Sequence, residues 1–316
     1  MSQADPAAAI VEVEHGLSAA GYIPSRQIAT AVYLAGALEK PMLVEGPAGV
    51  GKTELAKSIA AWRGLPLIRM QCYEGLDEAK SLYEWKYGKQ LLYTQILRDK
   101  IGDVLGGASG LEAALKKLHG FGDLFFSPEF LEPRPLLRAL QEESGAVLLI
   151  DEIDKSDQEF EAFLLEILSD YQVSIPEIGC VAARTPPIVV LTSNNMRDLG
   201  DALKRRCLHL HIGFPEPALE RRIVDVRVPG IDDRLRRELV AFVQALRTLD
   251  LKKAPSISET LDWARALLLL HVPVLNAEVV RTTLNVLLKF ESDVEAAERQ
   301  IGELTGKARR DAERAG

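Results

Sequence analysis

The chain has 316 residues, 47% of them hydrophobic and 27% charged, and a formal net charge of −8 with a sequence isoelectric point of about 5.4. This length allows two domains with a sizeable core, and this composition is typical of a globular protein rather than a disordered or fibrous one. The acidic balance makes the chain a poor candidate for sequence-independent binding of nucleic acid, although a local basic stripe is compatible with it.

The N-terminal segment is expected to be a helical leader at residues 1–20. Its first fourteen residues include acidic residues but no basic one, so it does not have the character of a signal peptide. The nearest approach to a membrane span, residues 264–275, is broken by an arginine, a histidine and a proline. We therefore expect a cytoplasmic protein that is not an integral membrane protein. Ser25 can cap a second helix that extends to about residue 38.

A phosphate-binding loop of the form G-x-x-x-x-G-K-[ST] comes next. Its residues are Gly46, Pro47, Ala48, Gly49, Val50, Gly51, Lys52 and Thr53. An apolar strand is predicted before it at 41–45 and a helix after it at 52–63, and this context disfavours the alternative of an ordinary glycine-rich turn. The loop's N–H groups can cradle the phosphates of ATP, Lys52 can contact the β- and γ-phosphates, and Thr53 can offer its hydroxyl to Mg²⁺.

A second strand at 67–72 follows at a distance that suits a right-handed βαβ crossover. Beyond it, residues 74–126 are irregular, with a short helix expected at 77–85 and several glycines later. We interpret this stretch as an insertion with a function, with a solvated spacer as the alternative.

An unbroken apolar run at 146–150 predicts a central parallel strand, and Asp151 and Glu152 follow it directly. Ligands of open α/β sheets bind at this end of the strands. Asp151 is therefore expected to hold Mg²⁺, directly or through water, and Glu152 is the candidate base that polarises the attacking water. An acidic strand cap would be the simpler interpretation if no phosphate-binding loop came before it.

Two further strands complete the predicted sheet. After a hairpin around Gly179, the strand at 188–192 leads into Asn194, whose amide can orient the attacking water. Arg205 and Arg206 precede the last strand, at 208–212, as surface charges or as a finger that reaches a neighbouring subunit's nucleotide. The fold class is thus α/β with a central parallel five-stranded sheet.

Histidines and cysteines give little sign of a metal centre. Cys72, Cys180 and Cys207 are far apart without a C-x-x-C pair, which argues against a zinc site or a disulfide framework. His209 and His211 alternate on the last strand but lack a third ligand, so a structural role is the favoured interpretation.

The strands end near residue 214, and the pattern then becomes helical. Helices are predicted at 217–228, 232–249, 257–271 and 276–290, which makes 215–290 a small all-helical domain after the α/β domain at 21–214. Residues 291–316 are highly charged with a weak helical pattern, and a frayed, charged tail is expected there.

The order of these motifs resembles that of an AAA+ ATPase. The segments that carry the resemblance are GPAGVGKT, LLIDEID, LTSNN and ALKRRC, followed by a helical lid. The chain looks more narrowly like the MoxR-type group because of EKPMLVEGPAGVGKTELAKSIA, FSPEFLEPRPLLRALQEE and YQVSIPEIG, and within that group it most resembles a CoxD-like member.

This resemblance implies roles and partners. Asn194 is similar to the sensor that positions water, and Arg206 to the arginine finger, with Arg205 as its rival. Residues 74–126 resemble the insertion in helix 2 and residues 172–184 the hairpin before the sensor strand, both of which point toward the central pore of a ring in that family. A hexameric ring, a partner with a von Willebrand A domain and a metalloenzyme client are implied. The lid lacks the usual arginine between Pro255 and Thr260, and Arg265 is left unassigned.

The expected function is therefore ATP-driven remodelling or maturation of a partner protein, such as the insertion of a metal or cofactor into a metalloenzyme. The client part rests on the family alone. A DNA motor of the helicase or branch-migration type is the alternative, disfavoured by the acidic isoelectric point and the lack of an appended DNA-binding module. The intact Lys52, Asp151 and Glu152 speak against a nucleotide switch that does not hydrolyse.

Overall fold

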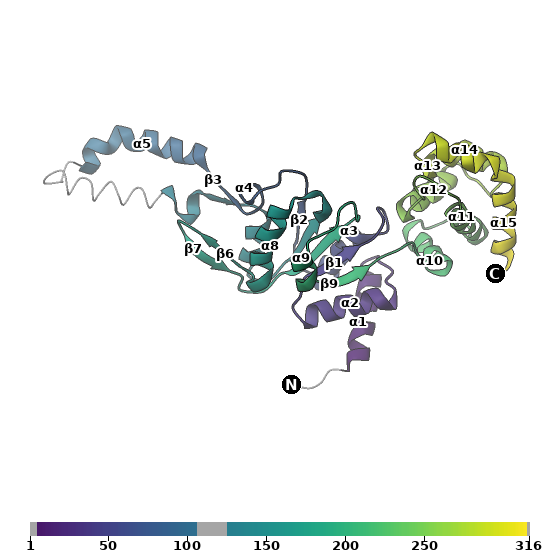
Figure 1. Cartoon of the computed structure of the whole chain (residues 1–316), viewed down its shortest axis with the longest axis horizontal. Helices are drawn as coiled ribbons and strands as arrows, with labels where there is room; N and C mark the ends of the chain where they lie inside the picture. The colour runs from purple at the N-terminus through teal and green to yellow at the C-terminus, as the bar shows by residue number, and fades with distance from the viewer. Residues whose placement is uncertain (1–4, 106–124, 315–316) are drawn as a thin grey trace.

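The computed structural model describes residues 5–105 and 125–314 (Figure 1). At its centre lies a sheet of five parallel strands in the order β2-β5-β8-β1-β9. Their bounds are β1 Met42–Glu45, β2 Leu67–Gln71, β5 Val147–Asp151, β8 Ile188–Ser193 and β9 Leu208–His211. The predicted α/β class with a five-stranded parallel sheet is confirmed, with β5 buried along its whole length as a central strand requires.

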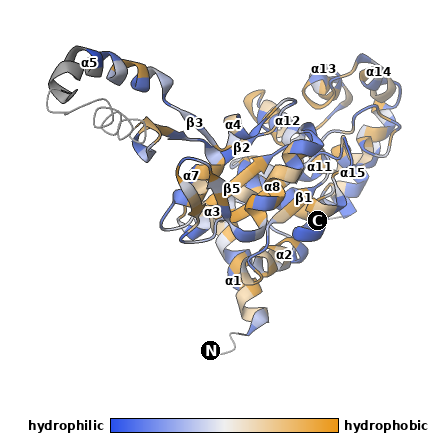
Figure 2. Cartoon of the chain, turned by 60° about the vertical axis from the view of Figure 1, so that its left-hand side comes forward, coloured by the Kyte–Doolittle hydropathy of each residue, from blue (hydrophilic) through white to orange (hydrophobic). Residues whose placement is uncertain are grey.

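Helices cover both faces of this sheet, and Figure 2 shows the mostly hydrophobic strands between them. One face packs against α1 (Pro6–Ala19), α2 (Arg26–Ala37) and α3 (Lys52–Arg63). The other face packs against α7 (Pro135–Gln141), α8 (Gln158–Asp170) and α9 (Asp201–Arg206). The alternation of side chains along each strand supplies both cores, because successive residues point to opposite faces. Leu149, for example, belongs to the first core and Ile150 to the second.

The irregular stretch after β2 is a small antiparallel unit that carries a long helix. The helix α4 spans only Glu78–Ser81 and is followed by β3 (Tyr83–Trp85), so the helix expected at 77–85 is wrong in its second half. The reason is long-range, because β3 pairs with β4 (Leu131–Pro133), nearly fifty residues later. The helix α5 (Tyr87–Leu105) projects away from the sheet (Figure 1). Residues 106–124 of the expected insertion lie outside the described part of the chain.

A hairpin of two short strands follows α8. It consists of β6 (Gln172–Ile175) and β7 (Gly179–Ala182), paired antiparallel. Val173 and Ile175 anchor it because both side chains are buried in the core shared with α7 and α8. A short 3-10 turn, η1 (Pro128–Phe130), lies at the base of the α5 unit, and a second, η2 (Ile153–Lys155), follows β5.

The remainder of the described chain is a helical lid. Its helices are α10 Pro217–Arg227, α11 Asp233–Leu246, α12 Ile257–Leu269, α13 Ala277–Leu287, α14 Glu291–Arg299 and α15 Ile301–Arg314. The prediction of a charged tail at 291–316 is wrong, because α14 and α15 belong to the lid and α15 packs along α11. Buried residues of α15 recur at helical spacing, namely Ile301, Leu304, Thr305, Ala308 and Ala312. The many charges on the opposite side of α15 hid this narrow apolar stripe.

A buried ion pair and its partners connect three lid helices, α10, α11 and α12. The guanidinium of Arg247 donates to both oxygens of Glu220, at 2.7 and 2.8 Å, and both side chains are almost fully buried. Gln244 and Thr260 donate to the same carboxylate, and Arg247 lies 4.8 Å above the ring of Phe214. The carboxylate is therefore fully partnered within the lid, as a charge in so dry a place needs to be.

Arg247→Met is expected to destabilise the protein by about 3–5 kcal/mol, because it leaves the Glu220 carboxylate buried without its cation. Urea denaturation followed by tryptophan fluorescence measures this, since Trp263 lies in the lid core. Arg299→Met is the matched control. It removes an exposed pair with Glu295, and such pairs contribute only about 0–1 kcal/mol. Equal effects of the two changes would show that the buried pair is not a major support of the lid.

Within residues 5–105 and 125–314, no helix is both long enough and apolar enough to cross a membrane.

Candidate functional site

The predicted phosphate-binding loop joins β1 to α3 at the carboxyl edge of the sheet. Gly46, Gly49 and Gly51 all have positive φ angles, of 147°, 76° and 99°. At Gly46 a side chain is also excluded by space, because a Cβ atom would lie 2.0 Å from the carbonyl oxygen of Ile212 at the end of β9. The loop therefore keeps a tight shape that only glycine at these positions allows.

Lys52 lies inside this loop rather than in solvent. Its ammonium group donates to the carbonyl oxygens of Gly46 and Pro47, both at 2.7 Å, and to Oδ1 of Asn194 at 2.8 Å. Burial lowers the pKa of Lys52, and the nearby carboxylates of Asp154, Asp151 and Glu152 oppose that shift. The bond between Lys52 and Asn194 brings together two predicted site residues that are 142 positions apart.

Thr53 and Asp151, the two residues predicted to hold Mg²⁺, are in direct contact. The Thr53 hydroxyl donates to Oδ1 of Asp151 at 3.0 Å, and the Thr192 hydroxyl of β8 donates to the same oxygen at 2.6 Å. The side chain of Asp151 is only 5% exposed. Hydroxyl and carboxylate oxygens are the ligands that Mg²⁺ prefers, so the donor set fits this metal.

Glu152 and Asn194 are also in contact. The amide of Asn194 donates to Oε1 of Glu152 at 3.2 Å, while Gln71 and Lys155 donate to Oε2 at 2.6 and 2.7 Å. The backbone of Glu152 is left-handed, with φ of 58°, which is uncommon for a residue other than glycine. Its N–H donates to the Thr192 hydroxyl of β8, and this bond fixes the turn that places the Glu152 carboxylate beside Asn194.

Three residues that the sequence reasoning missed support this arrangement. Arg69 donates through Nε and Nη2 to Oδ2 of Asp151, at 3.1 and 2.6 Å. Gln71, two residues later on β2, holds Glu152. Asp154 accepts from the backbone N–H groups of Asn194 and Met196, both at 3.0 Å, and so fixes the end of β8. In the sequence, Arg69 and Gln71 alternate with apolar residues, which indicates that they share one face of β2. This pattern does not indicate which strand lies beside β2.

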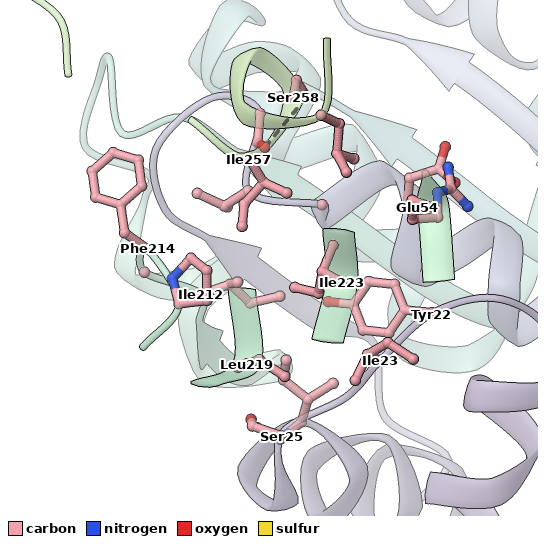
Figure 3. Close-up of a pocket in the computed structure, with 18 of the residues that line it drawn as sticks. Tyr22, Ile23, Ser25, Glu54, Ile212, Phe214, Leu219, Ile223, Ile257 and Ser258 are labelled. Atoms are coloured by element: carbon pink, nitrogen blue, oxygen red, sulfur yellow. Dashed lines mark hydrogen bonds and ion pairs between the residues drawn. The ribbon is translucent and has the colours of Figure 1, made fainter. Parts of the chain in front are cut away.

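The lid closes over the loop from the other side. The N–H and the hydroxyl of Ser258, in the first turn of α12, both lie 3.3 Å from the carbonyl oxygen of Gly49 and donate to it (Figure 3). Between lid and sheet lies a cavity of about 610 Å³. Apolar side chains line much of it, including Tyr22, Ile23, Ile212, Phe214, Leu219, Ile223 and Ile257. Its volume and lining suit the base and sugar of a nucleotide whose phosphates reach the loop.

Arg206 lies away from these residues. It ends α9, two positions before Leu208, which pairs with Met42 at the start of β1. The phosphate-binding loop begins at the other end of β1, so the length of the strand separates Arg206 from it. Its Nε donates to the Ser169 hydroxyl at 2.7 Å, and the side chain is exposed, as is that of Arg205. Arg265 instead lines the cavity and pairs with Asp262 at 2.9 Å.

The two histidines of β9 have separate surroundings. His209 pairs with Glu45 of β1, and His211 lines the cavity. In the described part of the chain no group of three or more histidine, cysteine, aspartate or glutamate side chains is arranged to hold a metal ion.

Comparison with known proteins places this site in a family. Residues 42–216 match the ATPase family associated with various cellular activities (AAA). An uncharacterized protein of Staphylococcus aureus strain RF122 is 27% identical over 238 residues, covering 73% of this chain and 76% of its own. The denitrification regulatory protein NirQ of Stutzerimonas stutzeri is 24% identical over 227 residues, covering 70% and 68%. Among solved structures, a RuvB mutant of Thermotoga maritima aligns with a TM-score of 0.46 and 18% identity, covering 83% of this chain and 67% of that one.

The AAA match covers more than half of the chain and includes the phosphate-binding loop, Asp151, Glu152, Asn194 and Arg206. Members of this family bind ATP and hydrolyse it. The chain therefore belongs to the AAA family and is an ATPase, distantly related to NirQ.

Proposed function

We propose that the chain hydrolyses Mg²⁺-ATP at this site and uses the energy, in the cytoplasm, to remodel or mature a partner protein in the manner of MoxR-type ATPases. The observation that carries the catalytic part is the convergence of Lys52, Thr53, Asp151, Glu152 and Asn194 from three strand ends at one edge of the sheet. The metal, held by Thr53 and Asp151, would neutralise charge on the β- and γ-phosphates.

The remaining side chains have distinct tasks in this proposal. Lys52 exchanges its carbonyl partners for phosphate oxygens when ATP binds. Glu152 accepts a proton from the attacking water, and Asn194, which already contacts both Lys52 and Glu152, orients that water. The apolar cavity under the lid would hold the base and sugar.

The site would be completed by a second copy of the chain. Arg206 is exposed at the edge of the sheet opposite to its own loop, so its guanidinium is available to a neighbour. This placement supports assembly into a closed ring, which we propose to be a hexamer, in which each Arg206 serves the next subunit's nucleotide.

The surface offered to a client is the projecting unit around α5. Four apolar side chains of this helix are more than half exposed, namely Tyr87, Leu91, Leu92 and Ile96. Exposed apolar surface of this kind is typical of an interaction site. We propose a protein client, with a von Willebrand A domain protein and a metalloenzyme as the partners suggested by the MoxR-type resemblance. The relation to NirQ, a protein named for the regulation of denitrification, supports a regulatory role for this chain.

A client remodeller should hydrolyse ATP at a rate that does not respond to single- or double-stranded DNA at low salt, and that falls when Mg²⁺ is chelated. The net charge of −8 gives DNA phosphates little attraction. Steady-state ATPase assays with and without each DNA, at two salt concentrations, measure this. A several-fold stimulation that disappears at high salt would favour a DNA motor instead, because such sensitivity reports contacts with phosphates.

A further inference from the structure

Every oxygen of the Asp151 carboxylate already has a partner in the protein. Oδ1 accepts from the hydroxyls of Thr53 and Thr192, and Oδ2 accepts the two N–H groups of Arg69. The Thr53 hydroxyl also lies 3.3 Å from Oδ2, but the two N–H groups of the guanidinium are the closer partners of that oxygen. A metal ion that binds at Oδ2 must therefore compete with these two hydrogen bonds.

Arg69 has the freedom to leave. Its side chain is 50% exposed, in contrast to the 5% of Asp151, and it comes from β2, the edge strand of the sheet. A Mg²⁺ ion bound at Thr53 and Asp151 would bring two positive charges close to the guanidinium. Their repulsion, together with the competition for one oxygen, favours rotation of Arg69 toward solvent.

The same guanidinium also contacts the neighbour of the candidate base. Nη2 of Arg69 donates to Oε1 of Gln71 at 2.8 Å, and Nε2 of Gln71 donates to Oε2 of Glu152 at 2.6 Å. A continuous chain of hydrogen bonds therefore runs from Asp151 through Arg69 and Gln71 to Glu152. When Arg69 leaves Asp151, Gln71 loses the donor that fixes its amide.

We propose that Arg69 is the resident counter-ion of the metal site: Mg²⁺ that arrives with the nucleotide displaces its guanidinium from Asp151, and this movement loosens the hold of Gln71 on Glu152. Arg69 is thus a positioning residue that reports occupancy of the metal site to the candidate base. This inference rests on the proposed Mg²⁺-ATP site.

A Mg²⁺ titration of nucleotide binding tests the displacement. The fluorescence of a methylanthraniloyl-ADP probe is followed at fixed protein concentration while Mg²⁺ is raised. Arg69→Met should lower the half-saturating Mg²⁺ concentration by about tenfold or more, because the metal no longer competes with a charge-assisted bond. Binding of the probe in EDTA should match wild type, which shows that the fold and the loop are intact.

Two matched variants separate displacement from simple charge. Arg138→Met removes one positive charge from an exposed position on α7, which packs against the other face of the sheet, and should leave the titration unchanged. Arg69→Lys keeps the charge but cannot form the fork, so its midpoint should fall between those of wild type and Arg69→Met. If Arg69→Lys has the same half-saturating Mg²⁺ concentration as wild type, only the positive charge at position 69 matters. That result would overturn the proposed displacement.

A double-mutant cycle tests the link to Gln71. Gln71→Leu removes an acceptor that steadies Arg69, so alone it should shift the midpoint in the same direction by less than Arg69→Met. In the Arg69→Met background it should add nothing, because it acts through Arg69. Additive shifts would refute the relay.

Failure of the proposed metal site and failure of the proposed role of Arg69 give different results. If wild type binds the probe equally well with and without Mg²⁺, the proposed metal site is wrong. If wild type depends on Mg²⁺ but Arg69→Met needs the same concentration or more, the metal site stands and the role of Arg69 is wrong.

Discussion

Arg206→Ala is expected to bind ATP with wild-type affinity and to hydrolyse it about 10³–10⁵-fold more slowly, the range found for arginine fingers supplied in trans. Arg206 cannot reach the loop of its own subunit, because it lies at the start of β9 whereas the loop begins at the end of β1. In the proposed ring, its loss would therefore remove charge stabilisation only from a neighbour's site. Nucleotide binding by fluorescence and steady-state ATPase assays separate the two effects.

Mixing experiments test whether the site is shared. Lys52→Ala protein should be inactive because its loop is impaired, yet adding it to Arg206→Ala protein should restore part of the activity. Mixed rings contain interfaces with an intact loop opposite an intact arginine. Arg205→Ala, one residue earlier on the same exposed helix end, is the matched comparison and should remain active. If Arg205→Ala loses ATPase activity while Arg206→Ala keeps it, Arg205 is the arginine finger. If the ATPase rate per subunit is the same in both variants as in wild type and does not depend on protein concentration, the ring model is contradicted.

Glu152→Gln is expected to keep ATP binding nearly intact and to lower turnover by about 10²–10⁴-fold, the usual contribution of general-base assistance. The amide is similar in size and can retain part of the contact with Gln71 and Asn194, but it cannot take a proton from water. Single-turnover hydrolysis with excess protein measures the chemical step directly.

The matched control for this carboxylate is Glu159→Gln, an exposed residue in the first turn of α8. It should hydrolyse ATP at the wild-type rate. Turnover near wild type in Glu152→Gln would remove Glu152 from the mechanism. A fall in turnover accompanied by loss of nucleotide binding would show instead that Glu152 supports the binding site.

The first contacts of the site could be predicted from the sequence because they follow strand ends. The glycine pattern located Lys52 and Thr53, and parallel strands that end in polar residues located Asp151, Glu152 and Asn194. Local patterns carry no information about strand order, and so they could not show Arg69 beside Asp151. That contact depends on β2 lying next to β5, although β5 follows β2 by about seventy-five residues and β1, which α3 joins to β2, lies two strands further along the sheet.

Two errors have a similar physical origin. The strand β3 exists because β4 supplies its hydrogen bonds, so the local helical spacing at 77–85 was a weak guide. The helix α15 was hidden because its buried face is narrow and includes a threonine and two alanines among charged neighbours. In both cases a distant partner decides the structure, and intrinsic propensity yields to tertiary packing.

The bonds of Lys52 bear on which ligands the loop will accept. All three of its donors are satisfied by Gly46, Pro47 and Asn194, so a ligand must offer acceptors at least as good as these before the ammonium will turn to it. Adenosine offers no anionic oxygen, and AMP offers its single phosphate close to the sugar. Only a chain of two or three phosphates can extend from the cavity along the loop and displace several bonds at once. The protein should thus not bind adenosine or AMP, although the cavity suits their base. Occupancy of the nucleotide site should then depend only on the concentrations of nucleoside di- and triphosphates.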